Sequence, residues 1–186
     1  MTVPGTDVRL VLGGARSGKT ALALRRAEGL GPRRLYVATG EARDAEMAAR
    51  IDRHRRERGA GWETSETPLG VAAILHAARG YDALLVDCLT LWLTNVMLAG
   101  KDVAAARVEL CAALGAAACP VLLVSNEVGL GLVPETPLGR RFRDEQGRLN
   151  QEIAAIAREV VFVAAGLPLV LKRDDAGPGS AEAGGA

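Results

Sequence analysis

Short apolar runs alternate along the chain with longer segments in which apolar residues recur every three or four positions. The short runs are typical of buried strands, and the longer segments are typical of helices that bury one face. The runs that predict strands are residues 8–12, 35–39, 83–87, 121–125, 160–163 and 169–172. The segments that predict helices begin after residue 20, at Asp44, at Thr67-Pro68, at Leu89, at Asp102 and near Leu149.

One long segment, Asn126–Arg148, interrupts this alternation because it is rich in glycine, proline and charge. A loop of this length in a compact domain is usually functional or mobile, and we expect such a loop here. The last two predicted strands are joined through Gly166, and we expect them to pair as a hairpin. Thr67 and Pro68 are expected to cap and begin a helix that continues to about Ala78.

The first predicted strand leads into a glycine-rich segment, GGARSGKT, that fits the phosphate-binding loop G-x-x-x-x-G-K-[ST]. Its glycines let backbone N–H groups close around phosphate oxygens at the N-terminus of a helix. We expect Lys19 to reach the β and γ phosphates and the Thr20 hydroxyl to hold Mg²⁺. The residues expected to form this loop are Gly13, Gly14, Ala15, Arg16, Ser17, Gly18, Lys19 and Thr20.

Strands and helices that alternate after a phosphate-binding loop predict an α/β fold with right-handed crossovers. We expect a P-loop NTPase-like (RecA-like) three-layer sandwich, in which a mainly parallel central sheet is followed by C-terminal antiparallel strands. The 186 residues are enough for one such domain. We expect a single nucleotide-binding catalytic domain over residues 1–173, and a disordered tail over residues 174–186, which are small, polar and rich in glycine.

The composition argues against several other classes of protein. The net charge is +1, so no overall field favours nucleic acid or an anionic membrane surface. Three cysteines and two histidines show no metal-binding spacing, and an odd, unpatterned set of cysteines suits a reducing cytoplasm. No apolar run reaches the length of a membrane span, and the first seven residues do not resemble a signal peptide. We therefore expect a soluble, cytoplasmic protein that does not bind nucleic acid.

The apolar run 83–87 ends in a carboxylate, Asp87. A strand that ends in aspartate is the second magnesium-binding element expected in phosphate-loop proteins, so Asp87 and Thr20 are the candidate Mg²⁺ ligands. The pattern is short and common, and an ordinary aspartate at a strand end is the alternative.

Positive charge is concentrated around His54 in the helix expected from Asp44. One interpretation is that the surrounding arginines form a solvated helix face, in which Asp52 and Glu57 pair with some of the charge. A patch that binds nucleic acid is a variant of this interpretation. The phosphate loop in the same chain favours another, in which the guanidinium groups neutralise charge during phosphoryl transfer. The positive surroundings should keep His54 neutral, so that its imidazole can attack an α phosphorus. The five arginines are Arg50, Arg53, Arg55, Arg56 and Arg58.

With these residues placed, the chain resembles the bifunctional adenosylcobinamide kinase and adenosylcobinamide-phosphate guanylyltransferase family of cobalamin assembly. The resemblance covers roughly residues 10–172, and a series of segments in this order is far more specific than a phosphate loop alone. The segments are GGARSGKT at 13–20, YVAT at 36–39, EMAARIDRHR at 46–55, WETSE at 62–66, DCLTLWLTN at 87–95, SNEVGLGLVP at 125–134 and R-x-F-R-D-x-x-G-R-x-N-Q at 140–151.

The resemblance implies two reactions. In the first, the hydroxyl of the aminopropanol arm of adenosylcobinamide takes the γ phosphoryl group of ATP or GTP. In the second, the product phosphate attacks a GMP unit, which gives adenosylcobinamide-GDP and pyrophosphate. The family carries GMP on a histidine that His54 matches here, and its members are similar in assembling as homotrimers. Outside the phosphate loop, the implied guanine-nucleotide contacts are Thr39, Gly40, Glu41, Arg55, Arg56, Glu57, Arg58, Glu66 and Asp87.

Several alternatives stay open. The guanine-reading motif N-K-x-D is absent, and Glu66 is our hypothesis for the residue that accepts hydrogen bonds from the guanine edge. A plain small-molecule kinase with a structural His54, and a nucleotide-dependent switch protein, are the competing functions. The corrin-binding residues are not indicated by any pattern, and loop scaffolding is as good an interpretation of the polar candidates. Those candidates are Asn126, Glu127, Arg140, Arg143 and Asp144.

Overall fold

The structure is a computed structural model and describes residues 7–41 and 61–174. Its strands are β1 (Val8–Gly13), β2 (Arg34–Ala38), β3 (Trp62–Glu66), β4 (Ala83–Asp87), β5 (Val121–Asn126), β6 (Glu159–Ala164) and β7 (Leu167–Arg173). Its helices are α1 (Lys19–Glu28), α3 (Val71–Ala77), α4 (Leu89–Leu98), α5 (Val103–Gly115) and α6 (Pro137–Ile156).

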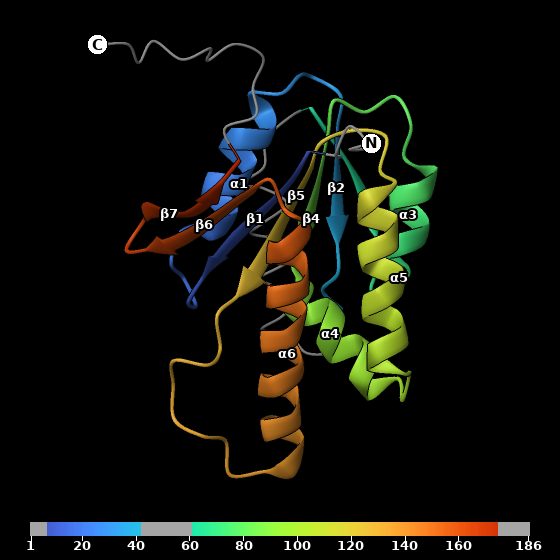
Figure 1. Cartoon of the computed structure of the whole chain (residues 1–186). Helices are drawn as coiled ribbons and strands as arrows, with labels where there is room; N and C mark the ends of the chain where they lie inside the picture. The colour runs from blue at the N-terminus through green and yellow to red at the C-terminus, as the bar shows by residue number, and fades with distance from the viewer. Residues whose placement is uncertain (1–6, 42–60, 175–186) are drawn as a thin grey trace, which may run out of the picture.

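The strands of these ranges form one seven-stranded sheet in the order β3-β2-β4-β5-β1-β6-β7 (Figure 1). All neighbours are parallel except β6 and β7, which form the expected hairpin at one edge. The mainly parallel α/β sheet is therefore confirmed, and only the last strand is antiparallel. Because parallel strands point the same way, their carboxyl ends meet at one edge, which is where ligands bind in such sheets.

Two apolar clusters cover the two faces of the sheet. On one face, α1 packs through Leu24 and Ala27 against side chains that include Leu85 and Val124. On the other face, a larger cluster joins the sheet to α3, α4, α5 and α6, and α6 lies across the sheet from α1 in Figure 1. The phosphate loop therefore leads into the helix that packs alone against its face within the described part of the chain. No helix of that part is both long enough and apolar enough to cross a membrane.

The long loop that we expected over Asn126–Arg148 is wrong for most of its length, because the helix α6 begins at Pro137. Thr136 is the N-cap of this helix, because its Oγ1 accepts a hydrogen bond from the Gly139 N–H at 3.1 Å, and Pro137 occupies the first turn. The helix runs to Ile156, and the irregular connection after β5 is limited to residues 127–136.

The segment before α3 also differs from the expectation. The helix begins at Val71 and not at Pro68. The Thr67 N–H donates to the Ala38 carbonyl at 2.7 Å, so Thr67 extends the pairing of β3 with β2 and does not cap a helix. β3 itself was not predicted, because this edge strand is mostly exposed and carries no apolar run.

Other predicted boundaries are confirmed. The helix α4 spans Leu89–Leu98, and Asp102 caps α5 by accepting a hydrogen bond from the Ala105 N–H at 3.0 Å. The helix expected from Asp44 and the tail expected after residue 174 lie outside the described residues, and the proposed domain limits stay predictions.

Candidate functional site

The predicted phosphate-binding loop joins β1 to α1 at the carboxyl edge of the sheet. Gly18 is the N-cap of α1 and has a φ of 97°, in the left-handed region that favours glycine. Glycine has no side chain to cap the helix, and helix N-termini of this kind bind anions through backbone N–H groups. Lys19 is buried, and its Nζ donates to the Gly14 carbonyl at 2.7 Å. The ammonium group therefore lies over the loop, as expected for a lysine that contacts phosphate.

The turn between β6 and β7 supports this loop from one side. The Gly166 N–H donates to the Ser17 carbonyl at 2.9 Å. A Cβ at Gly18 would lie 3.2 Å from the Cα of Gly166, and a Cβ at Gly13 would lie 2.4 Å from the Val163 carbonyl oxygen. Ser17 Oγ is buried and has no hydrogen-bond partner among the described residues. An unpartnered hydroxyl inside the loop fits a site that is completed by phosphate oxygens.

Asp87 at the end of β4 lies within hydrogen-bond distance of the loop. Its Oδ2 accepts one hydrogen bond from Thr20 Oγ1 and one from the Tyr36 hydroxyl, each at 2.9 Å. Thr20 and Asp87 are thus brought together as predicted, although 67 positions separate them in sequence. A hydroxyl and a carboxylate are the hard oxygen ligands that Mg²⁺ prefers, with substrate phosphates filling other positions. In the described ranges, no three His, Cys, Asp or Glu side chains are grouped so that they could hold a metal ion by themselves.

Tyr36 is a site residue that the sequence did not indicate. It is 4% exposed, and its ring meets that of Trp62 edge-on, with 6.1 Å between centroids and 87° between planes. The Arg34 guanidinium in turn lies over the Trp62 ring, 5.2 Å from its centroid. These contacts fix the phenol ring while its hydroxyl bonds Asp87, and no local sequence pattern reports a contact of this kind.

Thr39 lies at the predicted edge but uses its side chain to join two strand ends. Its Oγ1 donates to the Cys88 carbonyl at 2.7 Å and accepts from the Cys88 N–H at 2.8 Å, while its own carbonyl accepts from Asn95 Nδ2 at 2.8 Å. The residue is fully buried. Burial, and secondarily the Asp87 charge, raises the pKa of the Cys88 thiol to about 11, so this thiol is not a nucleophile at neutral pH.

Glu66 ends β3 in the same row of residues as Asp87. Ala38 is the register partner of both, so Glu66 and Asp87 stand two strands apart, about 10 Å at the usual strand spacing. The Glu66 side chain is exposed, and Gly40 and Glu41 follow β2 at the same edge. The candidate contacts from the sequence therefore converge on one edge wherever the structure describes them.

The rest of the predicted site lies outside the described residues. These positions are His54, with Arg50, Arg53, Arg55, Arg56, Glu57 and Arg58.

The residues considered as corrin contacts lie in two different places in the structure. Asn126 ends β5 and Glu127 follows it, whereas Arg140, Arg143 and Asp144 lie on α6. Arg140 donates to the carbonyls of Pro134 and Glu135, which is a structural role at the start of the helix.

A buried polar network backs the end of β5. Ser125 Oγ donates to Asn150 Oδ1 at 2.7 Å and accepts from Gln146 Nε2 at 2.9 Å. Asn150 Nδ2 donates to the Asn126 carbonyl at 3.1 Å, and the Asn126 N–H donates to Thr90 Oγ1 at 2.9 Å. Sequence reasoning missed this network because it assigned residues 137–148 to a loop.

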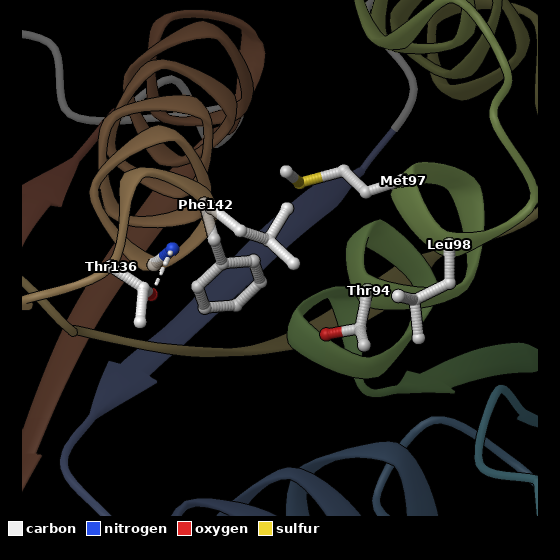
Figure 2. A pocket seen from close by; sticks show the side chains of 7 residues that line it. Thr94, Met97, Leu98, Thr136 and Phe142 are labelled. Atoms are coloured by element: carbon white, nitrogen blue, oxygen red, sulfur yellow. Dashed lines mark hydrogen bonds between the residues drawn. The ribbon is translucent and has the colours of Figure 1, made fainter.

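A separate apolar pocket of about 330 Å³ lies between α4 and α6. Figure 2 shows the Phe142 ring of α6 directed into the space that faces Thr94, Met97 and Leu98 of α4. No residue of the phosphate loop lines it. The pocket can take an apolar group and lies apart from the loop that would bind phosphate.

Several known proteins are similar to this chain. A family model described as "Cobinamide kinase / cobinamide phosphate guanyltransferase" matches residues 9–171. The chain is 49% identical over 166 residues to the bifunctional adenosylcobalamin biosynthesis protein CobP of Pseudomonas aeruginosa, a match that covers 88% of this chain and 96% of that protein. It is 41% identical over 182 residues to the corresponding protein CobU of Salmonella typhimurium, covering 88% and 98%.

Among solved structures, the P4 protein from bacteriophage phi6 in complex with ADP matches with a TM-score of 0.52 and 18% identity. The match covers 92% of this chain and 57% of that chain. This likeness concerns the fold alone, and it confirms the expected P-loop NTPase-like architecture.

Proposed function

Because the chain belongs to the cobinamide kinase / cobinamide phosphate guanyltransferase family, we propose that it carries out both reactions at the carboxyl edge of its sheet. It phosphorylates adenosylcobinamide with ATP or GTP and then transfers GMP from GTP to the product. The observation that carries this assignment is the phosphate loop with Thr20 hydrogen-bonded to Asp87, in a chain that matches the family over nearly its whole length.

In the kinase step, the substrate hydroxyl oxygen gives up its proton to solvent and forms a bond to the γ phosphorus, while the bond from that phosphorus to the β,γ-bridging oxygen breaks. Loop N–H groups and Lys19 hold the phosphates in place and offset the charge that moves to the leaving diphosphate. The buried position of Lys19 supports this role, because its charge is poorly screened by water there.

We propose Mg²⁺ as the metal of this site, held by Thr20 and Asp87. When bound, the ion neutralises charge on the phosphate oxygens. The Thr20 hydroxyl and the Asp87 carboxylate present oxygen atoms to one place, which supports the choice of a hard cation.

In the transferase step, we propose that the neutral imidazole of His54 forms a bond to the α phosphorus of GTP and pyrophosphate leaves. The phosphate of adenosylcobinamide phosphate then attacks the same phosphorus, the bond to the His54 nitrogen breaks, and adenosylcobinamide-GDP is formed. The transfer of GMP thus takes place as two successive displacements at the α phosphorus, as in other covalent mechanisms. The guanine nucleotide contacts are proposed to include Thr39, Gly40, Glu41, Arg55, Arg56, Glu57, Arg58 and Glu66, together with the loop.

We also propose that the protein acts in the cytoplasm as a homotrimer, without nucleic acid. The absence of disulfides among its three cysteines, Cys88, Cys111 and Cys119, supports a reducing compartment. The family resemblance and the exposed leucines of β7 support self-association.

The transferase assignment is tested by incubating the purified protein with Mg²⁺ and GTP labelled in turn at the α and γ phosphates, followed by denaturation and peptide mass analysis. We expect a GMP adduct on His54 that is labile to acid, stable to base and absent from His54→Ala. If active protein keeps no label from the α phosphate, even with corrinoid phosphate present, the covalent mechanism fails and a simple kinase becomes the proposed function.

A further inference from the structure

The side chain of Asn126 projects from the face of the sheet on which α1 packs. Side chains alternate between the two faces along a strand. Ser125 bonds Gln146 of α6 and so faces the other way. Val124 and Leu122 belong to the apolar cluster beneath α1, and Asn126 continues that row. Asn126 therefore faces the side of the sheet that carries the phosphate loop.

The register of the sheet places Asn126 beside the start of that loop. β5 lies between β1 and β4. Asn126 is the register partner of Gly13, the first loop residue, while Asp87 is the partner of Val124. The Asn126 carboxamide thus stands between the loop and the strand that carries Asp87, and it lies two residues further toward the carboxyl edge than Val124, the register partner of Asp87.

The backbone of Asn126 is fixed, whereas its carboxamide is left unused. Its N–H is bonded to Thr90 and its carbonyl to Asn150, at 2.9 and 3.1 Å. The half-buried side chain makes no hydrogen bond to any residue in the described ranges 7–41 and 61–174. A half-buried amide held by a rigid backbone and left without a partner is suited to a ligand oxygen.

We propose that Nδ2 of Asn126 donates a hydrogen bond to the terminal phosphate of the bound nucleoside triphosphate. The loop and the N-terminus of α1 hold the inner phosphates, and Asn126 contacts the group that a diphosphate lacks. Asn126 is therefore the residue that distinguishes the triphosphate substrate from the diphosphate product. The inference rests on the proposed nucleotide-binding function of this loop.

The test compares Mg²⁺-dependent binding of GDP and of a non-hydrolysable GTP analogue to the whole protein by calorimetry. Hydrogen bonds to charged groups are stronger than those between neutral groups, so Asn126→Ala should weaken analogue binding about tenfold or more. GDP binding should stay within about twofold, because the diphosphate does not reach Asn126. Gln151→Ala, which removes an exposed carboxamide from α6, is the matched control and should change neither.

A second variant keeps the test independent of packing. Asn126→Asp preserves the shape of the side chain but places a carboxylate against phosphate, so analogue binding should weaken at least as much as in Asn126→Ala, and again GDP binding much less. Equal losses for both nucleotides, or no loss for the analogue, would overturn the proposal. If the unaltered protein bound neither nucleotide, the proposed function itself would fail, and the two failures are thereby distinguishable.

Discussion

At the scale of single residues, the chemistry of the site depends on how Asp87 is held. One carboxylate oxygen accepts hydrogen bonds from both Thr20 and Tyr36. Two donors on one oxygen fix the carboxylate plane and leave the other oxygen for the metal or its water ligands. Tyr36 is therefore expected to position Asp87 without touching the nucleotide.

Replacement of Tyr36 by phenylalanine tests this role. Loss of a hydrogen bond to a carboxylate should destabilise the fold by about 1–2 kcal/mol and raise the Mg²⁺ concentration needed for half-maximal nucleotide binding roughly fivefold. Titration of nucleotide binding with Mg²⁺ measures the second effect, which a merely structural tyrosine would not change. Tyr81→Phe is the matched control, because the Tyr81 hydroxyl bonds the exposed Glu63 at 2.6 Å. A normal Mg²⁺ response in Tyr36→Phe would leave Tyr36 a packing residue only.

Glu66 is the residue on which base preference is predicted to depend. Its exposed carboxylate at the end of β3 can accept hydrogen bonds from the N–H groups of the guanine edge, which adenine does not match. Glu66→Ala should lower the preference for GTP over ATP about tenfold in competition binding, and Glu63→Ala on the same strand should not. We would abandon the hypothesis if the preference in Glu66→Ala equalled that of the unaltered protein.

At the scale of elements, the structure differs most from the sequence prediction at α6. The inner face of this helix places Gln146 among buried positions, so the apolar spacing from Phe142 to Leu149 and Ile153 is interrupted. Gly139 and Gly147 further lower the helix propensity. The signal that was present is Thr136-Pro137, an N-cap followed by proline, which marks the true start of the helix.

The cap of α6 is a measurable contribution to stability. Thr136→Ala removes the acceptor of the Gly139 N–H and should lower the free energy of unfolding by about 1 kcal/mol. Chemical denaturation followed by circular dichroism measures the change. Thr136→Ser retains the hydroxyl and should restore most of the loss. Equal stability of Thr136→Ala and the unaltered protein would mean that solvent replaces the cap without cost.

Much of the site could be predicted because its parts are contiguous patterns. The phosphate loop is eight successive residues, and Asp87 ends an obvious apolar strand, so each is recognisable by itself. The Tyr36 contact with Asp87 joins residues 51 positions apart, and the position of Asn126 beside the loop depends on which strands are neighbours. Contacts of this kind follow from the sheet order, which no local pattern encodes.

At the scale of the whole molecule, the exposed edge strand β7 is the feature that most favours assembly. Within the described ranges 7–41 and 61–174 it pairs only with β6, and it carries Leu167, Leu169 and Leu171 with exposed fractions of 73%, 61% and 55%. An apolar strand with an unpaired edge is a template for association with another chain. We therefore expect subunit contacts of the proposed homotrimer to include β7.

A charged substitution on β7 tests this expectation. Leu169→Lys should convert the proposed trimer to smaller species, because burying an unpaired ammonium in an interface is unfavourable. Light scattering coupled to size exclusion measures the mass. Val108→Lys places the same charge at a position on α5 that is 70% exposed and should leave the mass unchanged. If Leu169→Lys remained a trimer, β7 would not be part of the interface. If the unaltered protein were a monomer, the proposed trimer itself would be contradicted.

The central claim is that one chain performs phosphoryl transfer through its loop and nucleotidyl transfer through His54. The most direct measurement is analysis by mass spectrometry of the corrinoids formed from adenosylcobinamide, Mg²⁺ and GTP by three proteins. The unaltered chain should form adenosylcobinamide-GDP, His54→Ala should stop at adenosylcobinamide phosphate, and Lys19→Ala should form little of either. Formation of adenosylcobinamide-GDP by His54→Ala at the unaltered rate would contradict the account.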